Sequence, residues 1–273
     1  MARACPGGLR GRGPRGPRRR PDHLLHLPGI GAMGKSLIHF AFAVLCWAFG
    51  SVALAQDART FVPSGAKVYA PVLVEKQEAV WPQAPEPWTL AGLVEQESCI
   101  SLTHSRCWNP RAELRTHREY GFGFGQVTVA YRPDGSERMN VFNELRNTHN
   151  SLRDWTWENR YDPGFQLTAI VEMNRSLWRR IAANPGATVT DQWAFVLSSY
   201  NGGAAGVLQD RRLCSNTRGC DPARWFGHVE RTSLKSRVPQ PGYGNRSWYE
   251  INRSHVRNVL TIRRAKYQAF WRT

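Results

Sequence analysis

The sequence lacks the short patterns that assign many proteins to a class at once. It has no C-x-x-C pair and no H-E-x-x-H segment, so it gives little support for a zinc site. It has no internal repeat, and only residues 125–131 alternate clearly between polar and apolar side chains, so little β-strand is predicted. Gly121, Gly123 and Gly125 do not form a phosphate-binding G-x-G-x-x-G, because the third glycine comes one residue too early.

Long apolar runs are also scarce. The run from Leu37 to Phe49 is shorter than the roughly 20 residues that span a membrane. It follows Lys35 and precedes Ala53-Leu54-Ala55, which is the form of a secretory signal peptide with an A-x-A cleavage site. We therefore predict a signal peptide at residues 33–55 that is cleaved after Ala55. An uncleaved membrane anchor is the alternative.

Residues 1–32 are rich in Arg, Pro and Gly and have too few apolar side chains for a core. They are predicted to be a disordered basic extension. Because the signal peptide begins at Met33, we expect translation to start there, which would leave residues 1–32 untranslated. A genuine basic arm is the alternative.

Cysteines are few, and two of the six lie in the leader. Cys99, Cys107, Cys214 and Cys220 remain, as two pairs that are close in the sequence. Two local disulfides, Cys99–Cys107 and Cys214–Cys220, are the simplest of the three arrangements that four cysteines allow. Paired cysteines agree with an exported protein.

Acidic residues are outnumbered, with 21 Asp and Glu against 37 Lys and Arg and a net charge of +16. Eight of the basic residues and one acidic residue precede residue 56. Residues 56–273 therefore hold 29 basic and 20 acidic residues, a net charge of +9. A basic surface favours polyanionic partners, and outside the cell these are cell-wall carboxylates and lipid head groups. A nucleic-acid-binding protein is the alternative from charge alone, and predicted export argues against it.

The remaining chain predicts one mainly α domain at residues 67–273, after a flexible lead-in at 56–66, with at most a short β-hairpin around 125–131. Residues 99–120 show no sustained period and are interpreted as a structured loop. Helices are predicted in eight segments: 68–81, 88–98, 136–149, 151–157, 164–183, 192–200, 223–234 and 247–271.

Several helix ends carry recognisable signals. Pro82 ends the first helix, and Asn184-Pro185-Gly186 ends the long one. Thr190 or Asp191 is expected to cap the helix over 192–200, and Asp221 the next one. The last helix is expected to expose a solvated basic face formed by Arg253, Arg257, Arg264 and Lys266.

Glu97 ends an otherwise apolar helical stripe. Leu90, Leu93, Val94 and Glu97 are spaced i, i+3, i+4 and i+7, so they share the face of a helix that normally turns inward. Partial desolvation of the carboxyl there favours its protonated form, which a general acid needs. A structural role, in which Glu97 pairs with an Arg or caps the next turn, is the alternative.

Three segments then occur in a fixed order: Glu97-Ser98, the EYGFGFGQ segment at 119–126, and the SSYNGG segment at 198–203. Over about residues 88–210 the chain resembles the lysozyme-like domain of soluble lytic transglycosylases and goose-type lysozymes, which carry Glu-Ser, Gly-x-x-Gln and Ala-Tyr-Asn-x-Gly. It departs from the family pattern at Ser199, which replaces Ala, and in the longer spacing from Glu97 to Gln126.

The resemblance implies a lysozyme-like fold and the cleavage of peptidoglycan without a metal or cofactor. Glu97 would protonate the β-1,4 glycosidic oxygen between N-acetylmuramic acid and N-acetylglucosamine, and Ser98, Gln126, Tyr200 and Asn201 would bind substrate. Local capping by Ser98 and core packing of Tyr200 are the alternatives to these roles. In a lytic transglycosylase the muramoyl 6-hydroxyl attacks its own anomeric carbon and leaves a 1,6-anhydro end.

Two other functions are compatible with the same residues. A hydrolytic lysozyme needs a second carboxylate, for which Glu119 is the candidate. A peptidoglycan-binding scaffold without activity is the other. In each case we expect a bacterial protein of the periplasm or the exterior, which meets the membrane only through its signal peptide, and the sequence identifies no protein partner.

The tryptophans divide into two predicted groups. Trp108, Trp155 and Trp157 lie in or near predicted loops, where an indole could stack on a sugar face. Trp178 and Trp193 occupy helical core positions. Core packing is the default expectation for any one of them.

Overall fold

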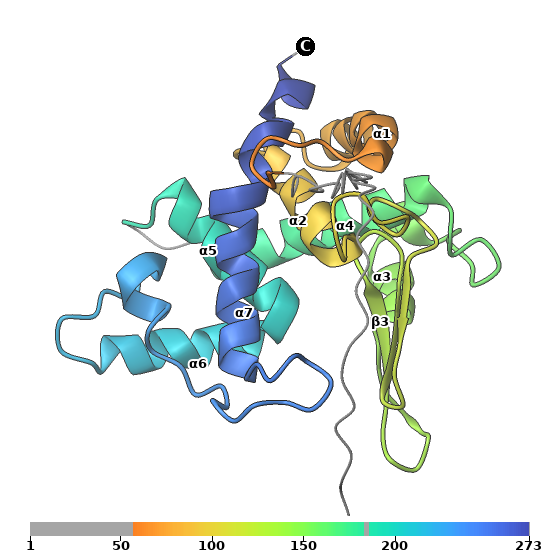
Figure 1. The fold of residues 1–273 in the computed structure, drawn as a ribbon. Coiled ribbons are helices and arrows are strands. Elements are labelled where there is room, and N and C mark those ends of the chain that lie inside the picture. Colours follow the sequence, from red (N-terminus) through yellow and green to blue (C-terminus); the bar gives the residue numbers. More distant parts are fainter. Residues whose placement is uncertain (1–56, 183–185, 273) are drawn as a thin grey trace, which may run out of the picture. The chain divides into compact units, whose positions relative to one another are not determined.

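The structure is a computed structural model that describes residues 57–182 and 186–272. In this part the chain is mainly helical, with one small antiparallel sheet (Figure 1). The predicted extension at 1–32, the signal peptide at 33–55, and Asn184 and Pro185 of the predicted helix stop lie outside the described residues. No helix in the described part is both long enough and apolar enough to cross a membrane.

Two helices open the described chain, α1 (Ser64–Val80) and α2 (Trp88–Ser98). Helix α2 has the predicted bounds, and the apolar side chains of its predicted stripe are fully buried. Helix α1 begins earlier than predicted, inside the segment interpreted as a flexible lead-in. Val62 explains the difference, because its side chain packs against the core just before Pro63 and Ser64 start the helix.

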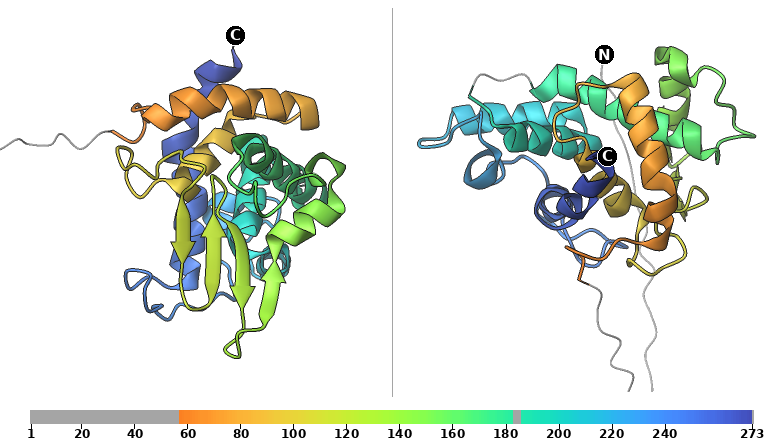
Figure 2. Two further views of the ribbon diagram at one scale, coloured as in Figure 1. Left: turned by 90° about the vertical axis from the view of Figure 1, so that its right-hand side faces the viewer. Right: turned by 90° about the horizontal axis from the view of Figure 1, so that it is seen from above.

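The sheet has four strands in the order β1 (Glu113–Arg115), β2 (Glu119–Phe122), β3 (Val127–Tyr131) and β4 (Glu137–Asn140), seen side by side in Figure 2. Strand β3 lies in the segment predicted from alternation, but the sheet is larger than a short hairpin, which was the most that the sequence predicted. Strands β1 and β4 are short and carry two charged residues each, and β2 has three consecutive buried residues, so alternation does not reveal them. Their pairing, for example Tyr120 opposite Val129, depends on contacts distant in the sequence.

The region after β4 is less helical than predicted. Asn140 ends β4 and caps α3 (Val141–Thr148) by accepting a hydrogen bond from the Asn143 amide, so only the second half of segment 136–149 is helix. Segment 151–157 contains only the end of a 3₁₀ turn, η1 (Asn150–Leu152). Its Trp155 is buried against Phe142 in a small core beneath the sheet, and this packing replaces the predicted helix.

The central helices follow the predicted pattern. Helix α4 (Pro163–Leu177) starts at an Asp162 cap with proline in its first turn and continues into a π-helical turn, η2 (Trp178–Ala182). Helix α5 (Val189–Gly202) is followed by α6 (Ala204–Ser215). Thr188, not Thr190 or Asp191, caps α5, and Asp191 instead accepts a hydrogen bond from the Trp225 amide.

The prediction of a helix at residues 223–234 is wrong. Only a short turn, η3 (Trp225–Val229), forms there, and Phe226 and Gly227 inside it have non-helical backbone angles. Gly227 has φ 77°, a left-handed conformation that interrupts a right-handed helix. Burial of Trp225 against Phe195 holds this arrangement.

The last helical run consists of α7 (Trp248–Arg257), η4 (Asn258–Arg263) and η5 (Arg264–Trp271). Ser247 and Glu250 form a capping box at its start. The prediction of an exposed basic face is wrong. The side chain of Arg253 is buried in an ion pair with Asp210, and that of Lys266 in an ion pair with Glu95. Helical spacing did not reveal them, since their acidic partners come from other parts of the chain.

Both predicted disulfides are present. Cys99–Cys107 closes the loop that follows α2, and Cys214–Cys220 closes the loop that follows α6. Disulfides persist in oxidising compartments, so they are compatible with an extracellular or periplasmic protein.

Replacing Arg253 tests the buried ion pair. Arg253→Met is expected to lower the free energy of unfolding by about 3 kcal/mol, because it leaves the Asp210 carboxylate buried beside Lys235 alone, at 3.4 Å. Arg257→Met on the same helix is the control, since Arg257 is 57% exposed and its pair with Glu230 is worth about 1 kcal/mol or less. Urea unfolding measures both, and equal losses would contradict the assignment.

Candidate active site

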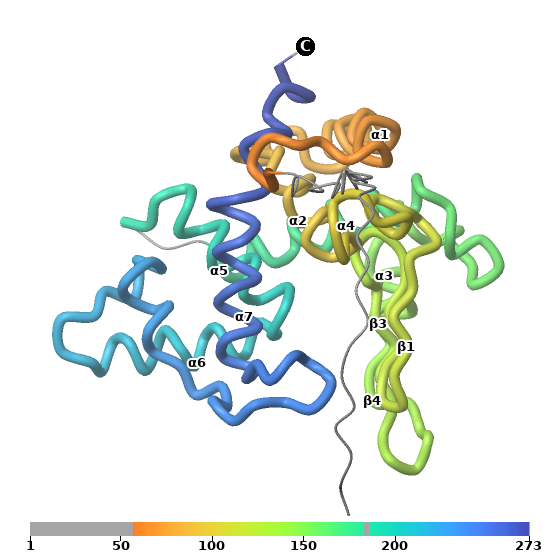
Figure 3. The backbone as a smooth tube through the Cα atoms, in the orientation of Figure 1, coloured from red at the N-terminus to blue at the C-terminus, as the bar shows by residue number. Residues whose placement is uncertain are grey.

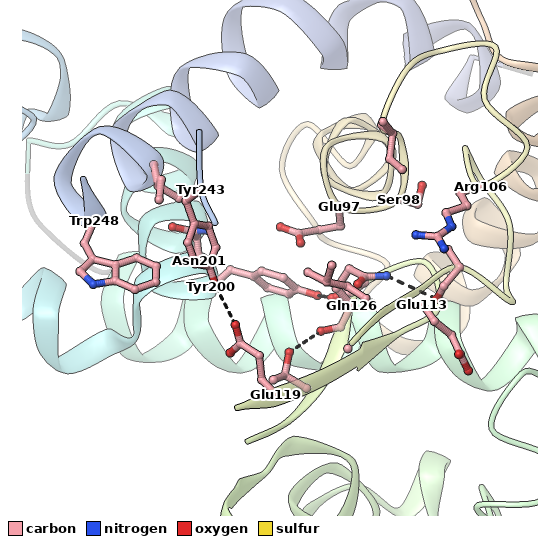
Figure 4. A pocket seen from close by; sticks show the side chains of 17 residues that line it. Glu97, Ser98, Arg106, Glu113, Glu119, Gln126, Tyr200, Asn201, Tyr243 and Trp248 are labelled. Carbon is pink, nitrogen blue, oxygen red and sulfur yellow. Dashed lines mark hydrogen bonds between the residues drawn. The ribbon is translucent and has the colours of Figure 1, made fainter. Parts of the chain in front are cut away.

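One cleft of about 430 Å³ lies between α2, the sheet, α5 and the start of α7 (Figure 4). It is lined by all of the residues for which the sequence predicted a role in substrate chemistry: Glu97, Ser98, Glu119, Gln126, Tyr200 and Asn201. Glu97 and Asn201, the first and last of them, are more than one hundred positions apart in the chain. The fold therefore brings the three sequence segments together in space.

Glu97 occupies the last turn of α2, directly above the buried apolar stripe. Its carboxylate points into the cleft in Figure 4, and 16% of the side chain is exposed. Oε1 lies 2.6 Å from Nε2 of His255 on α7. The acid is thus partly desolvated, as its sequence position predicted, but with a histidine as partner instead of an arginine.

Sequence reasoning missed His255. The signal available was weak: Asn252, His255, Val256 and Val259 are spaced i, i+3, i+4 and i+7 on the last helix, so two polar residues share its inward stripe. All four are buried in the structure. A buried polar residue on an apolar stripe has a partner inside the protein.

Ser98 uses its hydroxyl within the fold. It donates to the Val94 carbonyl at 2.7 Å and accepts from the Trp108 amide at 3.0 Å, and the residue is 4% exposed. These bonds match the local role left open for it in the sequence. They attach the loop closed by the Cys99–Cys107 disulfide to the end of α2, the helix that carries Glu97.

Gln126 lies in the tight turn between β2 and β3. Its backbone has φ 48°, and its side-chain amide donates to the Gly123 carbonyl at 3.0 Å. Gly125 is required there, because a Cβ atom would lie 2.6 Å from the Tyr200 hydroxyl. Gln166, a buried residue that the sequence did not single out, accepts from the Phe124 amide and fixes the turn from below.

Tyr200 and Asn201 end α5 at the floor of the cleft. The Tyr200 hydroxyl donates to the Gly125 carbonyl at 2.7 Å. Burial raises the pKa of Tyr200 well above its ordinary value, and the negative charge of Glu97 raises it further. Tyr200 therefore stays a neutral hydroxyl beside the acid. Asn201 accepts a hydrogen bond from Asn252 at 3.0 Å.

Glu119, the candidate second acid, begins β2 and lines the same cleft. Its Oε1 accepts a hydrogen bond from the Tyr243 hydroxyl at 2.8 Å. Tyr243 belongs to the long loop before α7, whose course is visible in Figure 3. Burial and this bond raise the pKa of Tyr243, so the bond joins a neutral hydroxyl to the carboxylate across the cleft.

Glu113 is a further carboxylate in the cleft wall. It accepts hydrogen bonds from the Tyr120 and Tyr161 hydroxyls, and these bonds, with nearby Arg160 and Arg115, hold its pKa below the ordinary value. In Figure 4 its side chain extends away from Glu97. Glu113 is therefore a charged carboxylate whose surroundings differ from those of Glu97.

A second hollow of about 450 Å³ continues the cleft. The two hollows share Glu119, Gly125, Gln126, Thr128, Tyr200 and Asn201. The second extends past the end of α5 toward Arg138 and Met139 on β4. Together they form a groove that continues beyond Tyr200, which suits a chain molecule better than a compact ligand.

Most of the tryptophans singled out in the sequence pack in the core, which was the default expectation. Trp193 is buried, and Trp178 packs partly buried against the same core. Trp108 and Trp155 are also buried and present no face to a sugar. Trp157 is 40% exposed. Trp248, which was not singled out, lines the cleft beside Tyr243.

No cluster of three or more His, Cys, Asp or Glu side chains within residues 57–182 and 186–272 could hold a metal ion. No protein-family model matches the chain, and no curated protein matches it.

The tyrosine bonds of Glu113 predict a pH effect on stability. A carboxyl whose pKa is lowered on folding stabilises the protein above its unfolded-state pKa of about 4.5, and this stabilisation is lost as pH falls through the folded value. We expect wild type to melt at a higher temperature than Glu113→Gln at pH 7. Thermal melts should show this difference shrinking below about pH 4.5, and a difference that is constant with pH would contradict the prediction.

Proposed function

We propose that this protein is a lytic transglycosylase that cleaves the β-1,4 bond from N-acetylmuramic acid to N-acetylglucosamine in peptidoglycan and leaves 1,6-anhydro ends. The observation that carries the proposal is the position of Glu97. Its carboxylate faces one cleft together with Gln126, Tyr200 and Asn201, the residues by which the sequence resembles this family. Residues that resemble a family motif by chance have no reason to line one cleft.

The arrangement of elements also supports a lysozyme-like fold. Helices surround a buried core, a small antiparallel sheet forms one wall of the cleft, and the acid lies at a helix end between them. The groove continues on both sides of Tyr200, as a glycan strand requires.

The proposed reaction needs one acid. Protonated Glu97 gives its proton to the glycosidic oxygen as the bond to the muramoyl anomeric carbon breaks. The muramoyl 6-hydroxyl then attacks that carbon, and the hydroxyl proton passes to the Glu97 carboxylate, which restores the acid. The reaction consumes no water, and the neutral Tyr200 side chain lines the same cleft as Glu97.

A hydrolytic lysozyme is the second candidate, because Glu119 lines the same cleft as Glu97. A hydrolase needs its second carboxylate free to activate water or attack carbon. Oε1 of Glu119 accepts a hydrogen bond from Tyr243, which leaves its other oxygen for such a role, so the products of the reaction distinguish the two candidates. A peptidoglycan-binding scaffold is disfavoured by the retention of the acid.

The setting of the proposal is the bacterial periplasm or the exterior, after removal of the signal peptide near Ala55. There the net charge of +9 on the remaining chain would meet the carboxylates of peptidoglycan. The paired cysteines are compatible with this compartment.

Product analysis tests the proposal. Residues 56–273, with disulfides formed, are incubated with purified peptidoglycan, and the soluble products are identified by mass spectrometry beside those of Glu97→Gln. We expect anhydromuropeptides from wild type and a loss of about 10²-fold to 10⁴-fold in the variant, because the amide has no acidic proton to transfer.

Other products would overturn the proposal in defined ways. Reducing-end muropeptides that are lost in Glu119→Gln would identify a hydrolase with two carboxylates. Binding to peptidoglycan without release of any product, in wild type as in Glu97→Gln, would identify a scaffold.

A further inference from the structure

His255 is the one described residue whose side chain hydrogen-bonds the Glu97 carboxylate. The two residues are 158 positions apart, on α7 and α2, and their contact of 2.6 Å joins Nε2 to Oε1. His255 is 4% exposed. The histidine end of the bond is therefore shielded from water, and hydrogen bonds are strongest where water is excluded.

The other ring nitrogen of His255 indicates which tautomer is present. Nδ1 is buried and has no hydrogen-bond partner among the described residues. A buried N–H without a partner loses its hydrogen bond to water and gains none in return, and orphaned donors are rarer in proteins than orphaned acceptors. The favoured form therefore has a bare Nδ1 and a proton on Nε2.

A neutral imidazole with its proton on Nε2 donates to Oε1 of Glu97. Oε1 can accept this bond whether Oε2 is protonated or not, so the bond persists through the proposed reaction. Oε2 is then the oxygen that carries the acidic proton. An imidazolium would act differently, because its charge would hold Glu97 as a carboxylate and remove the proton that the acid must give.

We infer that His255 is a positioning residue for the acid: its Nε2–H fixes Oε1 so that Oε2 delivers the proton to the glycosidic oxygen and receives it back. The inference rests on the proposed function. His255 itself touches no substrate in this account and acts only through Glu97. A carboxyl held by one oxygen has a single orientation toward the cleft instead of a range of rotamers.

The position of His255 is itself fixed by the preceding turn of α7. Asn252 accepts from the Ser198 hydroxyl at 2.8 Å, and it donates to the Ser198 carbonyl at 2.9 Å and to Asn201 at 3.0 Å. These bonds lock α7 to the end of α5, which carries Tyr200. One face of α7 therefore sets the relative positions of the acid, Tyr200 and Asn201.

Kinetics on peptidoglycan test the inference with two variants and one control. His255→Leu removes the donor and is expected to lower kcat by about 100-fold with KM little changed, because orientation is lost and binding is not. His255→Gln retains a donor near the Nε2 position and is expected to keep most of kcat. Arg257→Met, exposed on the same helix, is the control and should match wild type.

Two kinetic outcomes would overturn the inference. Full kcat in His255→Leu would show that Glu97 needs no positioning by His255. Equal losses in the Leu and Gln variants, with unchanged thermal stability, would show that something other than the Nε2 donor matters. If His255→Leu does not fold, the tautomer measurement below decides.

Nitrogen-15 NMR of the histidine rings measures the tautomer in the wild-type protein without substrate. We expect Nε2 of His255 to be protonated and Nδ1 to be bare at neutral pH. A proton on Nδ1, or protons on both nitrogens, would overturn the inference. This result is independent of activity, so a wild type that releases no glycan would count against the proposed function and leave the tautomer to decide the role of His255.

Discussion

The contact between α2 and the C-terminal helical run determines where every other part of the cleft lies. Glu95 is fully buried and pairs with Arg263 and Lys266, each at 2.7 Å, and it also accepts from the Tyr267 hydroxyl. Gly92 lets the helices approach closely, since a Cβ there would lie 3.0 Å from the Arg264 backbone. Breaking a buried pair leaves an uncompensated charge, so this arrangement resists displacement.

The same contact also positions the sheet. The Trp108 indole donates to Tyr267 at 3.1 Å, and the Trp108 amide donates to Ser98. The end of the Cys99–Cys107 loop is thereby attached both to α2 and to the Tyr267 hydroxyl that bonds Glu95. The strands of the sheet follow this loop, so its attachment fixes where they begin. Glu97 lies in the last turn of α2, and His255 lies on α7, in the same helical run as Arg263 and Lys266, so the distance between the acid and the histidine follows from the packing of α2 against this run.

Much of the helical part could be predicted from sequence, because apolar spacing reports the buried face of α2 and α4 directly. The disulfides followed from the spacing of four cysteines. The sheet, the buried Arg253 and His255 could not be predicted in this way. Each depends on a partner from a distant part of the chain, and a charged or polar residue on a helix has the same spacing whether it meets water or a buried acid.

A crystal structure of Glu97→Gln with a bound peptidoglycan fragment that contains the muramoyl bond tests the central claim most directly. The amide cannot complete the reaction but can occupy the place of the acid. The account predicts a strand along the groove past Tyr200, with the glycosidic oxygen about 2.6–3.2 Å from one atom of the position-97 amide and His255 bonded to the other. A fragment bound outside the groove, or a scissile bond beyond reach of position 97, would contradict it.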